Sequence, residues 1–265
     1  MTPRTLVVFH AHPDDEAIAM GGTMAKAARD GHRVVLVVAT RGEHGEVDDG
    51  FLGPGEELWQ RREQETHAAA EVLGVQRVAF LDYVDSGMDG TPENDAPESF
   101  WQADVEEAAR RLADILEEEQ ADVFTIYDEW GVYGHPDHVQ VHRVGARAAE
   151  LAGTPRVYMS TVDQDRIRRL FKEAQEAGED DLPGDLDIDN FKLGVSGDRI
   201  TTRVDVSVFL DHKRRAMAAH ASQISETSFF LAMPPERFAV SFGLEEYIRL
   251  DERPAIEETD LFEGL

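Results

Sequence analysis

The most informative absence in this chain of 265 residues is cysteine, which does not occur at all. Without cysteine the protein has no disulfide bond, no thiolate metal ligand, no iron–sulfur cluster and no cysteine nucleophile. Any metal site must therefore be built from histidine and carboxylate side chains. The 10 histidines and 54 acidic residues supply both kinds of ligand in ample number.

Positive charge is also scarce, since 26 Lys and Arg residues face 54 Asp and Glu residues and give a formal net charge of −28. We expect most of this acidity to form a solvated surface, and we expect no binding to nucleic acid or to an anionic membrane, because both require a clustered positive field. The chain has no apolar run long enough to span a membrane and no signal-peptide pattern. The sequence therefore favours a soluble, cytoplasmic protein.

Several common enzyme signatures are missing as well. No lysine follows a glycine, so there is no phosphate-binding P-loop. Carboxylates follow the first predicted strand, where a dinucleotide-binding fold has its glycines. The segment 194–198 has aspartate at its fifth position and so misses the nucleophile elbow of α/β hydrolases. Zinc-dependent nucleoside deaminases need cysteines that this chain lacks.

Apolar runs alternate with amphipathic segments along most of the chain. We predict strands at 5–9, 33–39, 78–81, 123–126, 157–159 and 201–206, and helices at 15–29, 57–73, 100–119, 138–151 and 208–224. This order is typical of βαβ units, so we predict an α/β fold with a mostly parallel sheet flanked by helices, in a single domain over 1–265. The acidic stretch 163–198, which contains Gly and Pro, interrupts the pattern, and we predict an insertion or lid there.

Two related tetrapeptides follow the first and the fourth predicted strands. They are His12-Pro13-Asp14-Asp15 and His135-Pro136-Asp137-His138. Ligands of open α/β sheets bind at the carboxyl ends of strands, so these two segments are predicted to meet in one site. An alternative for the first segment is a strand-to-helix turn in which an aspartate caps the helix. The repetition of the same residues at a second turn favours a functional site.

The residue types of the two segments suit a hydrolytic metal site. His12, Asp15 and His138 offer two ring nitrogens and one carboxylate oxygen, which leaves a fourth coordination position for water. Three protein ligands with one open position are typical of catalytic sites, whereas a structural zinc site is closed. This ligand set suits Zn²⁺ and also Fe²⁺, so the identity of the metal stays open.

The remaining polar residues of the two segments suit acid–base chemistry. Asp14 lies beside the ligands and can accept a proton from water as a general base. His135 can protonate a leaving amine or stabilise an oxyanion, with Asp137 orienting its ring.

With these motifs in view, the sequence resembles the PIG-L / LmbE-like family of zinc-dependent N-deacetylases, whose members include the mycothiol-pathway N-acetylglucosaminyl-inositol deacetylase. The resemblance extends over about 5–223 and rests on the segments 11–16, 21–23, 62–65, 73–74, 85–88, 134–138 and 219–223. It implies a Rossmann-like LmbE fold and removal of an N-acetyl group from an amino sugar, with zinc on His12, Asp15 and His138. It also implies that Asp14 is the base and that His135 is the acid or the oxyanion partner.

The same resemblance suggests residues that contact the substrate. Tyr133 is similar to a tyrosine that some relatives place near the oxyanion. Arg62 and Asp85 fall where relatives hold sugar or inositol hydroxyls, and Glu46 is a further candidate. From the residues alone, Arg62 could equally be a surface helix residue, and Asp85 could cap a turn.

The sequence indicates a class of substrate but leaves alternative functions and the oligomeric state open. We expect a small-molecule N-acetylated amino sugar as the substrate, while the oligomeric state, including a homo-oligomer, is open. One alternative is an amidase acting on a non-sugar N-acyl natural product or a thiol conjugate, although relatives that cleave mycothiol conjugates carry a lysine where segment 18–20 has none. Another is a non-catalytic zinc-containing binding protein, which the presence of Asp14 disfavours. For His220 and Gln223 we expect a packed, hydrogen-bonded structural role.

Overall fold

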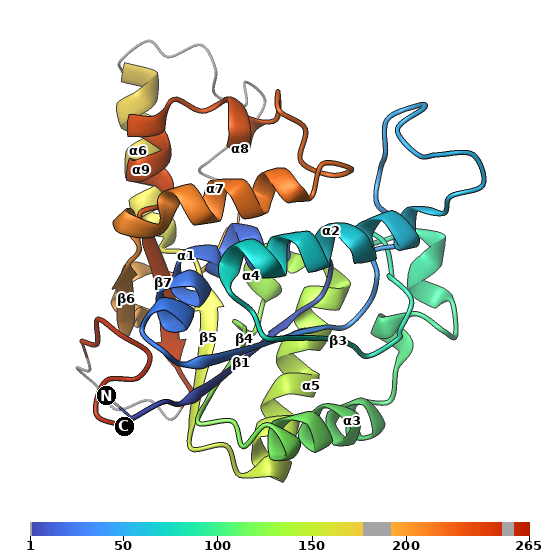
Figure 1. Cartoon of the computed structure of the whole chain (residues 1–265), viewed down its shortest axis with the longest axis horizontal. Coiled ribbons are helices and arrows are strands. Elements are labelled where there is room, and N and C mark those ends of the chain that lie inside the picture. Colours follow the sequence, from blue (N-terminus) through green and yellow to red (C-terminus); the bar gives the residue numbers. More distant parts are fainter. Residues whose placement is uncertain (1, 177–191, 251–256) are drawn as a thin grey trace.

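A mixed β-sheet forms the centre of the computed structural model, which describes residues 2–176, 192–250 and 257–265. The strand order is β3-β2-β1-β4-β5-β7-β6 (Figure 1). The strands are β1 (Thr5–His10), β2 (Arg33–Val38), β3 (Arg77–Phe80), β4 (Val123–Tyr127), β5 (Arg156–Thr161), β6 (Thr202–Asp205) and β7 (Leu244–Arg249). β1 to β5 are parallel, whereas β7 is antiparallel to both β5 and β6. The predicted mostly parallel α/β sheet is confirmed.

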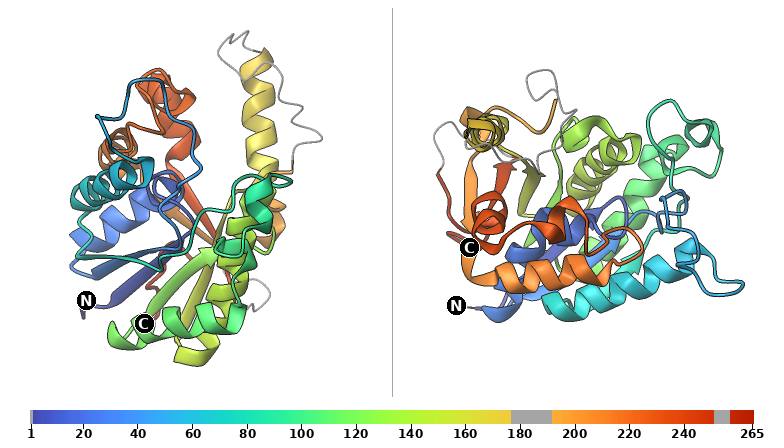
Figure 2. Two further views of the ribbon diagram at one scale, coloured as in Figure 1. Left: turned by 90° about the vertical axis from the view of Figure 1, so that its right-hand side faces the viewer. Right: turned by 90° about the horizontal axis from the view of Figure 1, so that it is seen from above.

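Helices cover both faces of this sheet, with α1, α2 and α7 on one side and α3 and α5 on the other (Figures 1 and 2). The helices are α1 (Asp15–Arg29), α2 (Leu58–Leu73), α3 (Val105–Glu118), α4 (Gly131–Gly134), α5 (Pro136–Ala152), α6 (Gln164–Glu176), α7 (Leu210–Ala219), α8 (Phe229–Ala232) and α9 (Pro235–Phe242). In Figure 2, α6 stands out from the sheet, opposite the region of α8 and α9.

The two helical layers enclose two separate hydrophobic cores. Along β1, Leu6 and Val8 pack into the core under α1, α2 and α7, while Val7 and Phe9 pack into the core under α3 and α5. Successive side chains of a strand point to opposite faces, so a strand covered on both faces needs an apolar residue at nearly every position. This explains the continuous apolar runs of the sequence.

Some predicted elements differ from the observed ones. The helix predicted at 100–119 starts at Val105, because the Asp104 side chain caps it by accepting the N–H of Glu107 at 2.9 Å. The helix predicted at 208–224 ends at Ala219. Sequence reasoning missed β7, whose buried Glu245 and Glu246 hide its strand character.

The predicted insertion or lid is described only in part. Its first residues form α6, and the segment after the gap returns to β5, with the N–H of Val195 donating to the carbonyl of Val162 at 3.0 Å. The acidic stretch 177–191 lies outside the described residues. A lid at this position therefore stays a prediction.

The sheet topology brings the two tetrapeptide segments to the same place. β1 and β4 are neighbours in the sheet, and the chain leads from β1 towards β2 on one side and from β4 towards β5 on the other. The carboxyl ends of β1 and β4 therefore flank the topological switch point, where open α/β sheets bind their ligands. The segment 12–15 follows the end of β1 almost directly, and the segment 135–138 follows β4 after the short helix α4.

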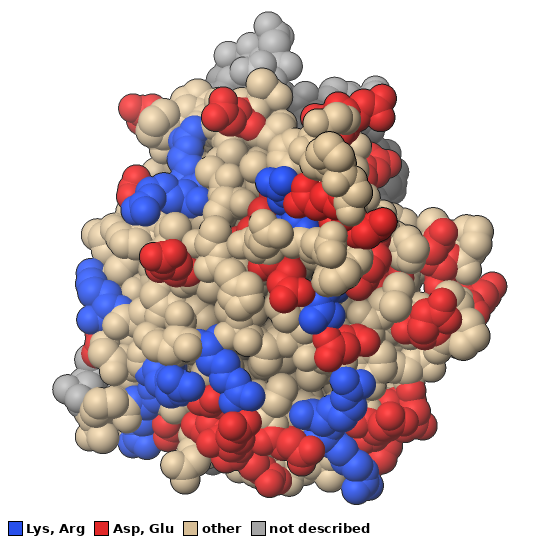
Figure 3. Space-filling model, turned by 45° about the vertical axis from the view of Figure 1, so that its right-hand side comes forward, with Lys and Arg blue, Asp and Glu red and all other residues tan. Residues whose placement is uncertain are grey.

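Two further observations concern the surface and the helices. On the face shown in Figure 3, Lys and Arg side chains lie interspersed with Asp and Glu side chains. Among the residues that the structure describes, no helix is long and apolar enough to cross a membrane.

Candidate active site

The loop between β1 and α1 holds Asp14 in an unusual backbone conformation. Its φ angle is 98°, a value that residues other than glycine rarely adopt and that is typical of functional sites. The Asp14 side chain makes no capping hydrogen bond to α1, and its carboxylate lies 3.3 Å from Nη2 of Arg62. The capping alternative for this segment is therefore wrong, and the Asp14 carboxylate is directed towards the site.

The three proposed metal ligands meet at the switch point. Oδ2 of Asp15 lies 3.5 Å from Nδ1 of His12 and 3.4 Å from Nε2 of His138. Nδ1 of His12, Nε2 of His138 and the Asp15 carboxylate thus face a common centre. His135 joins this group, because one nitrogen from each of His12, His135 and His138 lies within 4.8 Å of the others.

The carboxylate of Asp137 does not contact the His135 ring, which differs from the predicted arrangement. Its Oδ2 lies 3.1 Å from Nε2 of His12 and accepts the backbone N–H of Ser86 at 2.9 Å, and the Ser86 hydroxyl also donates to it. The ring of His135 instead accepts the backbone N–H of Asp137 at Nδ1, at 3.1 Å, because His135 is the N-cap residue of α5. Asp137 is therefore placed to orient His12.

This site suits a divalent metal ion for two reasons: its carboxylates carry an excess of negative charge, and a ring nitrogen is free to bind the ion. The buried carboxylates of Asp85 and Asp137 and the partly buried carboxylate of Asp15 lie next to His12. Asp14 adds a fourth carboxylate, whereas the site's one close guanidinium, among the residues described, belongs to Arg62. Buried charges need a partner, and a cation would neutralise this excess. When Nε2 of His12 donates to Asp137, its Nδ1 is left free to ligate, as in many carboxylate–histidine–metal arrangements.

Burial and neighbouring charges raise the pKa of one side chain in the site and lower the pKa of two others. Burial raises the pKa of Asp14 to about 6, although the Arg62 guanidinium opposes the shift. Burial lowers the pKa of His135 to about 4, and the nearby His12 and His138 rings lower it further. Burial disfavours ionisation of Asp15, yet the His138 and His12 rings hold its pKa well below the usual range. At neutral pH, the Asp14 carboxyl group is thus ionised and the His135 ring is neutral.

A strained loop carries Tyr133 to the edge of the site. Val132 has a φ of 67°, which is an outlier for a β-branched residue, and the N–H of Gly194 donates to its carbonyl. The Tyr133 hydroxyl lies 3.4 Å from Nε2 of His138, while the side chain is partly exposed. Tyr133 therefore faces the same centre as the metal-ligand candidates from the solvent side.

The three predicted substrate contacts occupy different environments. Arg62 is buried, not on the surface, and donates to the carbonyls of Pro13 and Gly42. Asp85 is also buried and accepts the N–H of Gly87 at 2.8 Å, so the alternative that it caps a turn is confirmed. Glu46 is exposed, and the structure gives its carboxylate no contact to the cluster.

Several residues that support the site had little or no signal in the sequence. Tyr127 stacks on the His138 ring, with centroids 4.5 Å apart, and its hydroxyl lies 2.6 Å from Nδ1 of His10. Ser86 donates hydrogen bonds to the Asp137 carboxylate. The sequence pointed to Ser86 only as a member of the segment 85–88. As predicted, His220 is buried and hydrogen-bonded, with Glu16 as its partner.

Histidine and aspartate donors gathered at the switch point of an α/β sheet are typical of metal-dependent hydrolases. Comparison with known proteins agrees with this class. The model of the family PIG-L: GlcNAc-PI de-N-acetylase matches residues 7–149. The chain belongs to this family of N-deacetylases, as the resemblance of its motifs predicted.

Named relatives are similar over nearly their whole length. The chain is 40% identical to a 1D-myo-inositol 2-acetamido-2-deoxy-alpha-D-glucopyranoside deacetylase of Acidothermus cellulolyticus, covering 99% of this chain and 95% of the relative. It is 39% identical to the protein of the same name from Thermomonospora curvata, covering 100% and 98%. The fold is also that of N,N'-diacetylchitobiose deacetylase from Pyrococcus horikoshii, with a TM-score of 0.62 at 22% identity, over 94% of this chain and 84% of that one.

Proposed function

We propose that the protein is a zinc-dependent hydrolase that removes the N-acetyl group from a 2-acetamido-2-deoxyglucopyranoside. The observation that carries the proposal is the meeting of the His12 and His138 rings at the Asp15 carboxylate, in a cavity that Asp14 also lines and in a chain of a de-N-acetylase family. The relatives named as deacetylases of an inositol glucoside make that compound the first substrate to test.

The metal would be held by His12, Asp15 and His138. A divalent metal ion bound there supplies Lewis acidity towards the acetyl carbonyl and lowers the pKa of water. Asp137 accepts the Nε2–H of His12 and thereby fixes the ring so that Nδ1 faces the centre.

Asp14 acts as the general base in this proposal. Its carboxylate, with a pKa of about 6, is ionised at neutral pH and accepts a proton from the attacking water. A base with a pKa close to the working pH can also return that proton. Asp14 is therefore suited to protonate the nitrogen of the departing amino sugar, so that the C–N bond breaks with release of acetate.

His135 is suited to stabilise the oxyanion, the second of the two roles that the sequence left open. Its Nδ1 accepts the N–H of Asp137, so the single proton of the neutral ring resides on Nε2. A neutral ring with Nε2–H donates a hydrogen bond to the oxygen on which negative charge develops. The hydroxyl of Tyr133, directed to the same centre, is proposed as a second donor. Arg62, Asp85 and Glu46 remain proposed sugar contacts.

The test is release of primary amine from 2-acetamido-2-deoxyglucopyranosyl inositol by the purified protein. We expect amine and acetate in equal amounts, loss of activity with a chelator, and recovery on adding Zn²⁺. Better recovery with Fe²⁺, together with iron in the purified protein, would replace zinc by iron. Amine release only from non-sugar N-acyl compounds would support the amidase alternative. Bound metal without any amine release would support a metal-containing binding protein.

A further inference from the structure

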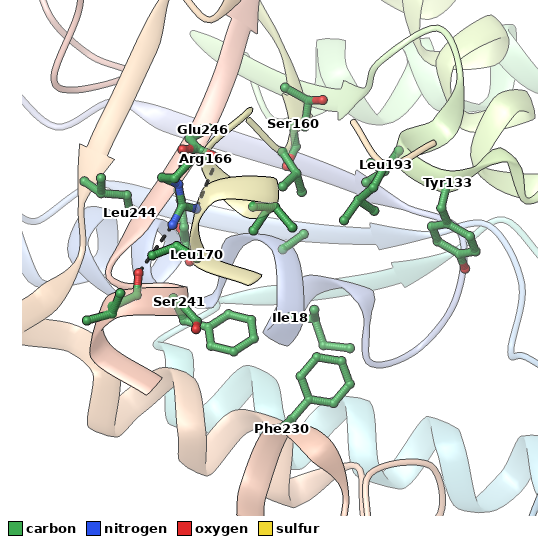
Figure 4. A pocket seen from close by; sticks show the side chains of 18 of the residues that line it. Ile18, Tyr133, Ser160, Arg166, Leu170, Leu193, Phe230, Ser241, Leu244 and Glu246 are labelled. Carbon is green, nitrogen blue, oxygen red and sulfur yellow. Dashed lines mark hydrogen bonds and ion pairs between the residues drawn. The ribbon is translucent and has the colours of Figure 1, made fainter. Parts of the chain in front are cut away.

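Tyr133, the proposed second donor to the oxyanion, lines the same cavity as Asp14, Asp15 and His138 (Figure 4). Its ring meets the His138 ring edge to face, with centroids 4.8 Å apart, and its hydroxyl lies 3.4 Å from Nε2 of His138. The Tyr133 side chain is partly exposed, and a donor to a transition state must be held in place. Contacts of the backbone that carries it are therefore important for its position.

Asp128 holds the backbone of this loop from the end of β4. Its side chain is completely buried, and its Oδ1 accepts the N–H of Trp130 at 2.9 Å and the N–H of Val132 at 3.1 Å. Its Oδ2 accepts the hydroxyl of Thr161 at 2.5 Å, which ties the carboxylate to the last residue of β5. The Asp128 carboxylate thus links the loop to two strands of the sheet.

Hydrogen bonds fix the peptide groups on both sides of Val132. Its N–H donates to Asp128, whereas its carbonyl accepts the N–H of Gly194 at 2.6 Å. Val132 has a φ of 67° and a ψ of −51°, a conformation that a β-branched residue keeps only where its surroundings impose it. The second peptide group leads directly into Tyr133, so these contacts set the position of its Cα and the direction of its side chain.

The loop also packs against the start of α5, which contains the metal-ligand candidate His138. A Cβ on Gly131 would lie 2.5 Å from Cβ of His138 and 2.7 Å from the backbone nitrogen of Val139. The loop therefore has no room to move towards His138. A loop released by Asp128 would move away from the site and carry the Tyr133 hydroxyl with it.

We propose that Asp128 is a positioning residue that acts through Tyr133, by holding the loop 130–133 so that the Tyr133 hydroxyl meets the developing oxyanion. The inference rests on the proposed function. The Asp128 carboxylate is buried and engaged with the loop, so it contributes to the reaction through the position of Tyr133. Loss of Asp128 should lower kcat with little effect on KM, because the hydrogen bond from Tyr133 forms mainly in the transition state.

The test combines Asp128→Ala with Tyr133→Phe in a double-mutant cycle, measured as amine release from 2-acetamido-2-deoxyglucopyranosyl inositol by the zinc-loaded protein. Asp128→Ala alone should lower kcat about tenfold. In the Tyr133→Phe background it should change kcat by less than about twofold, because the group through which Asp128 acts is already gone. Losses that multiply would show that Asp128 supports the fold or another group, and would overturn the inference.

The conservative variant Asp128→Asn separates position from charge. Its amide oxygen can still accept the two backbone N–H groups while its NH₂ group faces the Thr161 hydroxyl, so kcat should fall only about threefold. An asparagine variant as slow as the alanine variant would contradict a positioning role. If the alanine variant does not fold, Asp128→Asn repeats the cycle at this smaller amplitude, and a wild-type kcat in it would overturn the inference.

Asp122→Ala is the matched control, because Asp122 directly precedes β4, at the other end of that strand, and accepts the backbone N–H of Thr5 at 2.9 Å. It should keep the wild-type kcat. Zinc content should stay at the wild-type value in every variant, and loss of zinc from Asp128→Ala would show that Asp128 acts through His138 instead. Wild-type protein that releases no amine would contradict the proposed function together with the inference, whereas wild-type release with multiplying losses contradicts the inference alone.

Discussion

Nε2 of His220 lies 2.5 Å from Oε1 of Glu16, and both side chains are completely buried. The second oxygen of Glu16 accepts the backbone N–H of Asp14 at 3.0 Å. His220 follows α7 directly, so this pair ties the end of a helix late in the chain to the strained loop that carries the proposed base. The pair thereby helps to hold Asp14 in its unfavourable backbone conformation.

Replacing His220 by alanine should impair both the fold and catalysis. The variant leaves the Glu16 carboxylate buried without its partner, which should lower the free energy of unfolding by about 3 kcal/mol. Displacement of Asp14 should lower kcat more than it raises KM. Urea denaturation and steady-state kinetics measure the two effects. His67→Ala, at an exposed position on α2, is the control. Unchanged stability and kcat in His220→Ala would show that the pair does not support the loop.

Replacing Arg62 by glutamine should shift the pH dependence of activity. The Arg62 guanidinium favours the ionised form of Asp14, so its removal raises the pKa of Asp14 above about 6. The base must be ionised, and so the acid limb of the kcat/KM profile moves to higher pH, with a larger loss of activity at pH 6 than at pH 8. The profile of Arg61→Gln, whose side chain pairs with Glu56, should match that of the wild type. An unmoved acid limb in Arg62→Gln would contradict the assignment.

Replacing Tyr133 by phenylalanine should remove one donor to the developing oxyanion. We expect kcat to fall about 10- to 100-fold, with KM changed little, because the hydrogen bond forms mainly in the transition state. Metal content should stay at the wild-type value. Tyr83→Phe is a matched control, because the Tyr83 ring packs on Phe100 outside the cluster. Full activity in Tyr133→Phe would remove the tyrosine from the reaction.

His10 should make the free energy of unfolding decrease at acid pH. Burial lowers its pKa in the folded protein to about 4, whereas the ordinary value is 6.5. Between these pH values the unfolded chain binds a proton that the folded protein does not, so stability falls as pH decreases from 6.5 to 4. The loss is about 3 kcal/mol. The stability of wild type relative to His10→Gln should therefore decline over this range. A constant difference between pH 7 and 4 would refute the role of His10.

The sequence was sufficient to predict most of the strand–helix order and that the two tetrapeptides meet at one edge of the sheet. Two-sided burial made the parallel strands visible as apolar runs, and the residues of the two tetrapeptides stood out by their repetition. β7 could not be predicted, because Glu245 and Glu246 are buried through partners far away in the chain, among them Lys213 and Arg166. The orientation of Asp137 towards His12 also could not be predicted from the sequence, because it depends on Ser86, which the fold brings from another loop.

The most direct test of the account is amine release by the Asp14→Asn variant, measured together with its zinc content. Asparagine keeps the size of the side chain but cannot accept a proton from water, whereas His12, Asp15 and His138 are untouched. The account predicts at least a 100-fold loss of kcat with zinc bound in the wild-type amount. Near-wild-type turnover by the zinc-loaded variant would contradict the assignment of Asp14 as the base.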